Sequence, residues 1–355
     1  MMTVDNMIHH PAAWLTYSDK GGIVMSSRVR LARNLQHHHF PDWAPSKERW
    51  VLCEQLCQAF GRTRSLKDGA FMAVKSLPDI DRDVLLERHL ISQDLAGHEE
   101  GGGVLITADE RVSVMVNEED HLRLQVMLPG FDLDAAWQQA DAIDSDLEQY
   151  TEYAFSERLG YLTACPTNLG TGMRAGVLMH LSALKLTESL ELVVNGLERL
   201  GLTVRGFSGE GSEALGNMFQ VSNQVTLGEP EAETITHLKR LIGDLIRHEQ
   251  NARDRLLEER RSYLFDQLGR ALGMLLYARM LSCKETIDLM AGIRLGVEMG
   301  LIRGLTMKTV DEIMILTRPG HLRKLINSDT ATEVERDEAR AHFVRERLGN
   351  ASLDG

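Results

Sequence analysis

The chain has 355 residues, of which 43% are hydrophobic and 26% are charged, so it is long enough for two domains with a sizeable core. Its formal net charge of −13 argues against a surface that binds nucleic acid in general. Four cysteines exclude a disulfide scaffold, no apolar run reaches the ~18 residues of a membrane span, and the N-terminus lacks the regions of a secretory signal, so we expect a cytoplasmic protein.

The first two thirds of the chain predict a mixture of strands and helices. In chain order, the patterns predict a strand over 23–31, helices over 46–60 and 81–90, a hairpin of 103–108 and 111–116, a strand from 122, a long helix over 131–159, and strands over 202–207 and 219–227. The hairpin turn falls at Asp109-Glu110, because alternation of valine with polar residues begins just after it.

The composition changes near residue 230. Beyond it apolar residues recur at helical spacing, and the only prolines are Pro230 and Pro319. We therefore expect an N-terminal extension over 1–21, an α+β domain over 22–255 and an all-helical domain over 256–355.

Common phosphate-binding and metal-binding motifs are missing. The chain has no G-x-x-x-x-G-K-[ST] loop, no G-x-G-x-x-G after a strand and no protein-kinase H-R-D with a later D-F-G. Cys53 and Cys57 lack further ligands at metal spacing and fit a helix core, and three adjacent histidines from His37 point in different directions. We therefore expect no metal held by protein side chains.

Two clusters of charged residues follow strand periodicity. Arg28 and Arg30 alternate in the first strand and so point the same way, either as a solvated strand edge or as two guanidinium groups facing one anion. Glu119 and Arg123 are four residues apart in an extended segment and also share a face. A carboxylate and a guanidinium in one pocket would suit a site that handles a cation and an anion, whereas the alternative is a polar turn.

Two glycine-rich segments complete the set. The run from Thr163 to Ala175 predicts a tight turn, closed by Arg174, whose N–H groups can meet an anion. The run from Val204 to Glu213 has three glycines and predicts a mobile loop that carries Arg205 and Glu210.

Together these segments carry a family resemblance. The motifs S-S-R-V-R, N-E-E-D-H-L-R, C-P-T-N-L-G-T-G-x-R and R-G-x-x-G-E occur here in the order typical of the phosphagen (guanidino) kinases, and the resemblance covers residues 22–255. Within that family the chain most resembles the bacterial protein-arginine kinases of the McsB type, because only a short segment precedes the first motif and a helical domain with R-D-x-x-R-A follows. The resemblance implies a catalytic domain with a mainly antiparallel sheet flanked by helices.

The resemblance also implies a site for ATP whose Mg²⁺ is held by the nucleotide phosphates. Its five arginines match Arg28, Arg30, Arg123, Arg174 and Arg205, and His89 matches the histidine that packs on the nucleotide, although a histidine on a helix face remains an alternative. The full set of implied nucleotide residues is Ser26, Ser27, Arg28, Val29, Arg30, His89, Arg123, Arg174, Ala175, Gly176, Val177, Leu178, Arg205, Gly206, Phe207, Ser208 and Gly209.

Three further residues match the family's catalytic positions. Glu119 is the expected base, because a guanidinium must lose a proton as its nitrogen bonds to phosphorus. Glu210 is expected to align the guanidinium on closure of its loop. Cys165 matches the family's reactive cysteine, whose thiolate would help to position a cation, and a buried structural cysteine is the alternative.

The resemblance implies a kinase for arginine side chains of proteins that marks them for Clp-type proteolysis. A kinase of free arginine or another small guanidine, and a phosphoarginine-binding adaptor, are the alternatives. The implied partners are arginine-bearing proteins including a stress-gene repressor, an activating zinc-binding protein and a Clp-type ATPase or protease, with a homo-oligomer expected and neither nucleic acid nor membrane. The R-D-x-x-R-A motif implies an allosteric phosphoarginine site at Arg336, Asp337, Arg340 and Ala341.

Overall fold

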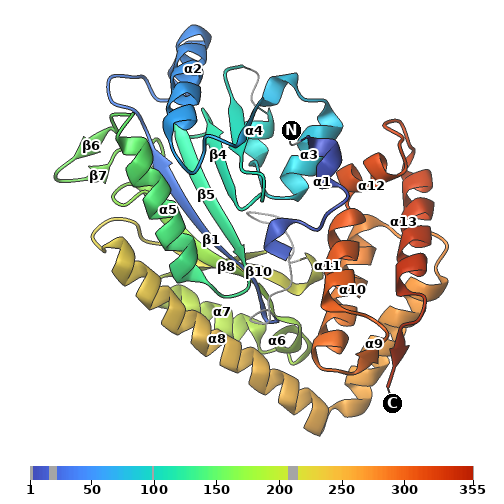
Figure 1. The fold of residues 1–355 in the computed structure, drawn as a ribbon. Coiled ribbons are helices and arrows are strands. Elements are labelled where there is room, and N and C mark those ends of the chain that lie inside the picture. The colour runs from blue at the N-terminus through green and yellow to red at the C-terminus, as the bar shows by residue number, and fades with distance from the viewer. Residues whose placement is uncertain (1–2, 16–21, 98–99, 207–214, 355) are drawn as a thin grey trace.

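The computed structural model describes residues 3–15, 22–97, 100–206 and 215–354, which are built around an eight-stranded sheet (Figure 1). Its strands lie in the order β2-β3-β4-β5-β1-β8-β10-β9, and all neighbours are antiparallel. Their bounds are β1 Val24–Arg33, β2 Ala70–Ala73, β3 Gly103–Ile106, β4 Val112–Val116, β5 Leu122–Pro129, β8 Met173–His180, β9 Leu202–Gly206 and β10 Met218–Asn223. This confirms the predicted α+β fold with a mainly antiparallel sheet.

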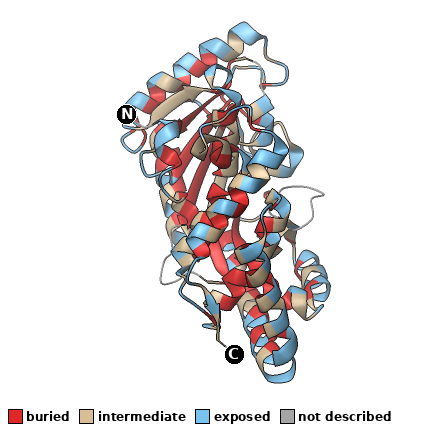
Figure 2. Cartoon of the chain, turned by 90° about the vertical axis from the view of Figure 1, so that its right-hand side faces the viewer, coloured by how far each residue is buried: buried red, intermediate tan, exposed pale blue. Residues whose placement is uncertain are grey.

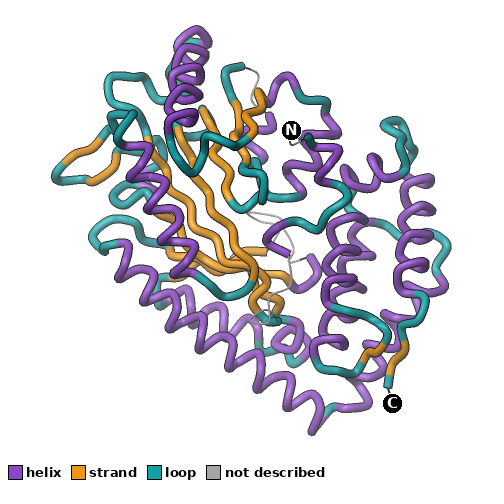
Figure 3. Tube along the Cα trace, viewed as in Figure 1, coloured by secondary structure: helices purple, strands orange, loops and turns teal. Residues whose placement is uncertain are grey.

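Helices surround the sheet and make up the C-terminal part (Figure 3). They are α1 Val4–Met7, α2 Ser46–Arg62, α3 Asp79–Glu87, α4 Gln93–Gly97, α5 Leu133–Glu148, α6 Ser182–Leu186, α7 Leu190–Arg199, α8 Glu231–Glu259, α9 Arg261–Tyr277, α10 Cys283–Glu298, α11 Met307–Leu316, α12 Pro319–Leu325 and α13 Glu333–Leu348. Beyond α8 the described strands are β11 (Ile302–Arg303) and β12 (Ser352–Leu353), two residues each, so the predicted helical character holds. No helix in the described ranges is both long and apolar enough to cross a membrane.

Local signals explain several helix starts. Proline precedes α2, α3 and α8, where its fixed φ directs the chain into the first turn. Side chains of Asp132, Ser282 and Thr306 cap α5, α10 and α11, and Thr332 forms a reciprocal capping box with Glu335 at α13. These caps satisfy N–H groups that the first turn leaves without helical partners.

The two faces of the sheet differ. On one face Val29, Leu31 and their neighbours pack with α2, α5 and α8 into a continuous apolar core. On the other face Met127 and Leu178 pack with α9 to α11 at one end, while Met115 packs with α3 and α4 at the other. Figure 2 shows this buried interior between sheet and helices. Polar side chains of the second face lie between its two apolar clusters.

Two predicted elements were wrong in extent. The helix expected over 131–159 ends at Glu148 and is followed by the short strands β6 (Phe155–Ser156) and β7 (Gly160–Tyr161). Here tertiary pairing overrides helical spacing, because the N–H of Ala154 donates to Asn34 O at 2.8 Å. The strand expected to run to residue 227 ends at Asn223, and β8 and β2 were not predicted.

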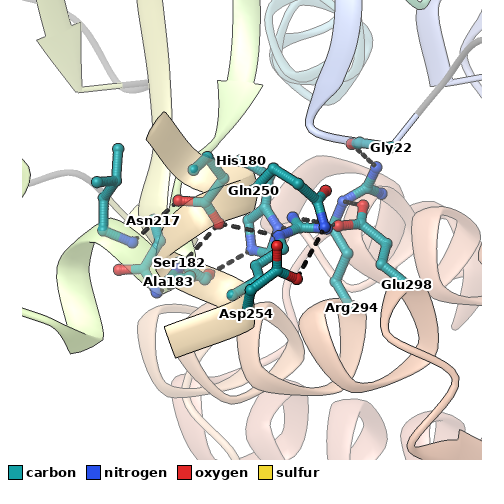
Figure 4. A network of polar contacts seen from close by, with 12 residues as sticks. Gly22, His180, Ser182, Ala183, Asn217, Gln250, Asp254, Arg294 and Glu298 are labelled. Atoms are coloured by element: carbon teal, nitrogen blue, oxygen red, sulfur yellow. Dashed lines mark hydrogen bonds and ion pairs between the residues drawn. The ribbon is translucent and has the colours of Figure 1, made fainter. Parts of the chain in front are cut away.

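A buried ion network joins the sheet domain to the C-terminal helices (Figure 4). Glu249 of α8 accepts from the N–H groups of Ala183 and Leu184 at 2.9 Å and from Arg253 at 3.1 Å. Arg253 also donates to Glu298 of α10 at 2.6 Å.

Arg294 extends this network. It lies 3.1 Å from Glu298, pairs with Asp311 of α11 and donates to Gly22 O at 3.1 Å. His180, at the end of β8, contacts Ser182 Oγ through Nε2 at 2.7 Å. Because these groups come from β8, α8, α10 and α11, they hold the C-terminal helices in place against the sheet domain.

Candidate active site

Strand register brings four arginines to the second face of the sheet. Arg30 of β1 lies opposite Arg174 of β8 on one side and opposite Gln125 of β5 on the other. Arg28 is two residues earlier on the same face, and Arg123 lies on the same face of β5 as Gln125. The prediction that Arg28 and Arg30 point the same way is therefore confirmed, and the pairing of β1 with β5 and β8 gathers the others around them.

These side chains line a cavity of about 420 Å³, which we call the arginine pocket. Arg205 at the end of β9 and Arg318, which precedes α12, also reach it. Its lining residues are Arg28, Arg30, Leu86, Glu87, His89, Ile91, Ser92, Gln93, Met115, Arg123, Gln125, Arg174, Arg205, Gly206, Gln220, Ser222 and Arg318.

The arginine pocket is strongly cationic. Burial, and then repulsion from Arg123 and Arg174, lowers the pKa of Arg28 from its ordinary value to about 9. The same causes hold the pKa of Arg30 well below its ordinary value, and Arg28 adds to the repulsion. Arg28 donates to Gln220 Oε1 at 2.5 Å, a neutral partner that leaves its charge uncompensated. Guanidinium groups that are buried and repel one another favour the binding of an anion with several negative oxygens, such as a polyphosphate.

One carboxylate on the pocket side is paired, and sequence reasoning missed it. Glu118 is 1% exposed and forms an ion pair with Arg123. Burial would raise the pKa of Glu118, but Arg123 outweighs this effect and the pKa falls to about 2. The spacing of Glu119 and Arg123 predicted that these two would share a face, because residues four apart do so on a straight strand. The segment is instead a turn, in which Asn117 has a φ of +52°, so parity does not apply.

Glu119 lies beside Cys165, and both are near Arg174. Asn168 Nδ2 is 3.5 Å from Glu119 Oε2, and Cys165 Sγ lies 3.0 Å from Thr167 Oγ1. Both Glu119 and Cys165 are near enough to Arg174 to raise its pKa, which burial nevertheless keeps below its ordinary value. The structure thus brings together three residues predicted from separate motifs.

The environment of Glu119 suits a proton acceptor. Burial raises its pKa above the ordinary value, and the charges of Asp120 and Glu118 raise it further. A carboxylate with a raised pKa is a stronger base than an exposed one. Glu119 lines a second cavity of about 700 Å³, the acidic pocket, whose lining is Asp42, Arg49, Gln93, Asp94, Gly97, Glu118 and Glu119. Gln93 lines both cavities, so an anion site and a cation site adjoin.

His89 forms part of the pocket wall just after α3. It has a φ of +57°, and its ring meets Trp14 edge to face with 5.3 Å between centroids. Burial, followed by the charges of Arg318, Arg28 and Arg30, holds the pKa of His89 well below its ordinary value. The ring is therefore neutral near pH 7 and presents an uncharged surface beside the guanidinium groups.

In the turn over 163–175 several N–H groups already have partners within the protein, so these groups are not the ones that could meet an anion. Thr171 N donates to Thr226 O at 2.9 Å, and Ala175 N donates to Asn223 Oδ1 at 2.8 Å. Gly170 has a φ of +108°, and a Cβ there would lie 2.3 Å from Thr226 O. The glycine serves close packing of this turn against the segment after β10.

Several predicted nucleotide residues do not reach the arginine pocket with their side chains. Val29, Ala175 and Val177 are fully buried in the core on the opposite face. Ser27 Oγ donates to Gly130 O at 2.9 Å and accepts from Asp132 N at 2.8 Å, so it ties β1 to the start of α5. A sequence motif covers consecutive residues, but consecutive side chains of a strand point to opposite faces, so every second residue of the motif lies in the core.

The rest of the predicted nucleotide set lies on the pocket face or outside the described residues. Ser26 and Leu178 line a small hollow beside the arginine pocket that also contains Arg28 and His89. A Cβ on Gly176 would lie 2.2 Å from Val221 O, so this position of β8 admits no side chain. Phe207, Ser208, Gly209 and the predicted catalytic Glu210 lie outside the described residues.

The R-D-x-x-R-A motif lies on α13, in the C-terminal helices. Arg340 is 2% exposed and donates to Thr317 O at 2.8 Å, to Leu281 O at 2.7 Å and to Asp337 Oδ1 at 2.5 Å. Ala341 is fully buried in the core. Arg336 is half-buried and donates to Ala331 O at 2.6 Å. Arg340 is therefore buried and held by three acceptors, whereas Arg336 is half-buried and donates to one carbonyl, although residues four apart lie on the same face of a helix.

Within the described ranges, no group of three or more His, Cys, Asp or Glu side chains is arranged to hold a metal ion.

Family models match most of the chain. Residues 52–252 match the family described as "ATP:guanido phosphotransferase, C-terminal catalytic domain", and residues 261–354 match "Protein-arginine kinase McsB C-terminal domain". The chain belongs to the ATP:guanido phosphotransferase family, whose members are phosphotransferases acting on guanidino groups. The second match assigns its C-terminal helices to the domain of the protein-arginine kinase branch of that family.

Similar proteins and solved structures agree with this family assignment. A protein described as protein-arginine kinase from Halothermothrix orenii is 42% identical over 92% of this chain and 93% of its own length. The proteins of that description from Bacillus pumilus and Bacillus subtilis are 45% and 42% identical over 92% of this chain and 90% of their own lengths. The crystal structure of a lombricine kinase, 26% identical, has a TM-score of 0.57 over 64% of this chain and 66% of that chain.

Proposed function

We propose that this protein transfers the γ-phosphoryl group of MgATP to arginine side chains of other proteins. The observation that carries the proposal is the junction of two pockets of opposite charge, one lined by arginines and one by carboxylates that include Glu119, with Gln93 lining both. The relatives described as protein-arginine kinases, which match nearly the whole chain, support the choice of substrate.

In this mechanism the arginine pocket holds the nucleotide. Phosphoryl transfer needs positioning and stabilisation of charge more than covalent chemistry. Arg28, Arg30 and Arg174 would hold the polyphosphate in line, and Arg205 would contact it from the end of β9. Mg²⁺ arrives with the nucleotide, whose phosphates hold it, and offsets part of the negative charge.

The acidic side receives the arginine of the substrate protein. A guanidinium has a pKa above ~12 and no free lone pair, so it must lose a proton as the N–P bond forms and the bond to the β-phosphate oxygen breaks. Glu119 accepts that proton, because burial and neighbouring carboxylates raise its pKa. Glu210, which follows β9 in the sequence, would align the guanidinium, and Cys165 would contribute its sulfur to the same cation site.

One experiment separates this function from its alternatives. The protein is incubated with MgATP and either an unfolded arginine-rich protein or free arginine, and acid-labile phosphate is measured. Phosphate on the protein substrate alone supports the proposal, and phosphate on free arginine supports a small-guanidine kinase. Phosphate on neither, together with binding of phosphoarginine, would indicate an adaptor.

The base is tested by Glu119→Gln. We expect turnover to fall by about 10²–10⁴-fold while the dissociation constant for ATP stays the same, since general-base roles have that size. Glu152→Gln, an exposed carboxylate at the surface, is the matched control. Turnover of Glu119→Gln equal to that of the control would remove Glu119 from this role.

The wider setting rests on the resemblance. We propose three parts to the chain, an extension over 1–21, the catalytic domain over 22–255 and a regulatory helical domain over 256–355, whose motif around Arg336 binds phosphoarginine. A cytoplasmic location fits the four free cysteines. A stress-gene repressor as substrate, an activating zinc-binding protein, a Clp-type protease that reads the mark, and a homo-oligomer are proposed on the same ground.

A further inference from the structure

Arg318 lies in the arginine pocket although it belongs to the C-terminal helices. The other arginines that line the pocket come from strands β1, β5, β8 and β9 of the sheet. Arg318 is the residue before α12, with extended backbone angles of −69° and 155°, and it lines the cavity together with Arg28, Arg30 and His89. None of the four motifs in the first 255 residues contains it.

Contacts on both sides of Arg318 hold its backbone in place. On the α3 side, Glu87 accepts from Gly320 N at 2.7 Å and from His321 N at 3.0 Å, and it lies 2.6 Å from His321 Nδ1. A Cβ on Gly320 would lie 2.8 Å from the Cβ of Asp83, so α12 sits directly on α3.

On the α13 side, Arg340 Nε donates to Thr317 O at 2.8 Å, and Thr317 Oγ1 donates to Ile313 O at 2.6 Å. Arg318 is therefore placed by the catalytic domain through Glu87 and by α13 through Arg340. A residue fixed from both sides can present its guanidinium to a ligand without losing much conformational freedom on binding.

The charge environment of Arg318 favours an anion. Burial lowers its pKa below the ordinary value, and Glu87 offsets only part of this effect. The positive charge of Arg318 in turn contributes, after burial, to the lowered pKa of His89. Arg318 thus lies close enough to His89 for its charge to act on the pocket wall, and a polyphosphate bound beside them would compensate that charge.

We propose that Arg318 binds phosphate oxygens of the nucleotide, so that the C-terminal helices complete the nucleotide site. The inference rests on the proposed function, in which the arginine pocket holds ATP. Arg340 of α13 would then be linked to the nucleotide through Thr317 and its neighbour Arg318. A ligand that shifts Arg340 would move Thr317 and, with it, the next residue in the chain.

The test compares Arg318→Ala and Arg318→Lys with the parent protein. Dissociation constants for ATP, ADP and adenosine are measured by calorimetry, and thermal unfolding is followed without nucleotide. We expect the affinity for ATP and ADP to fall roughly 10- to 100-fold in the alanine variant and less in the lysine variant, since hydrogen bonds to charged groups have that worth. The affinity for adenosine should not change.

Arg323→Ala is the matched control, because Arg323 lies on α12, which begins directly after Arg318, and faces Asp83 at 3.2 Å, outside the pocket lining. Unchanged affinity for ATP in both Arg318 variants would overturn the inference, while activity of the parent on arginine would leave the proposed function standing. An equal loss of affinity for adenosine would overturn the assignment to phosphate. A fall in thermal stability with intact affinity would make Arg318 a structural residue. A parent that binds no ATP would instead defeat the proposed function itself.

Discussion

Two groups of buried arginines in this protein differ in what surrounds them. In the ion network between the sheet and the C-terminal helices, Arg253 and Arg294 lie among Glu249, Glu298 and Asp311. Figure 4 shows Arg294 and Glu298 side by side in this network. In the arginine pocket, the causes that shift Arg28 are burial and the repulsion of two further arginines. The network is balanced by the chain's own carboxylates, whereas Arg28 and Arg30 are surrounded mainly by other arginines.

This difference separates structural arginines from functional ones. Removing one partner of a buried ion pair leaves an uncompensated charge and is costly, whereas removing one of several charges that repel each other is not. The network should therefore govern stability and the pocket should govern binding. Four predictions follow from that contrast.

The largest effect is expected in the network. Arg294→Met leaves Glu298 and Asp311 buried without this cation, so the free energy of unfolding should fall by about 3–5 kcal/mol. Urea denaturation measures it. Arg303→Met, which alters a side chain that is 75% exposed, should change the free energy of unfolding by less than about 0.5 kcal/mol. Similar values for the two variants would show that the network contributes little.

The pocket should behave in the opposite way. Arg28→Met removes one of several repelling charges, so stability without nucleotide should be equal or higher, while affinity for ATP falls roughly 10- to 100-fold. Arg33→Met is the matched comparison on the same strand. Arg33 pairs with Asp144 at 2.7 Å and lies 3.5 Å from the Tyr161 ring centroid, so its loss should reduce stability and spare ATP affinity. A large loss of stability in Arg28→Met would contradict the contrast.

The network also contains a proton-dependent group. Burial lowers the pKa of His180 to about 4, which the Glu298 carboxylate only partly opposes. As pH falls, the unfolded chain, with a histidine pKa of ~6.5, binds a proton before the folded protein does. The contribution of neutral His180 to the free energy of unfolding is therefore complete above pH ~6.5 and is lost toward pH 4. At pH 5 the loss should be on the order of 2 kcal/mol.

His180→Gln should therefore lower the dependence of stability on pH between about 6.5 and 4. Asp311, whose pKa burial raises to about 6, acts in the opposite sense and remains in both proteins, so the difference between them isolates His180. Urea unfolding at several pH values measures it. Parallel pH profiles for parent and variant would assign the histidine an ordinary pKa.

The smallest effect on stability is expected at Arg336. Arg340 resembles the network arginines, since its guanidinium donates to two carbonyls and to Asp337, whereas Arg336 is half-buried and donates to Ala331 O. Arg336→Ala should therefore change the free energy of unfolding by less than about 1 kcal/mol and abolish stimulation by added phosphoarginine. Stimulation equal to that of the parent would place the phosphoarginine site elsewhere.

Local patterns in the sequence were enough for much of the fold and part of the site. Hydrophobic periodicity predicted the hairpin of β3 and β4, the helix α2 and the helical C-terminal part, because these follow short-range rules. Alternation in β1 placed Arg28 and Arg30 on one side. The helix expected over 131–159 failed because contacts with Asn34, more than a hundred residues away, set the backbone from Ala154 onward.

By itself the sequence determined the family, the types of residue in the site and the face that each β1 side chain occupies, since motifs and period-2 alternation are local properties. Only the tertiary structure decided that Arg30 lies opposite Arg174, because register depends on how distant strands pair. It also decided that Glu118, not Glu119, holds Arg123, because a turn breaks the alternation there. Arg318 reaches the pocket because α12 packs on α3, a contact between residues more than two hundred positions apart that no local pattern encodes.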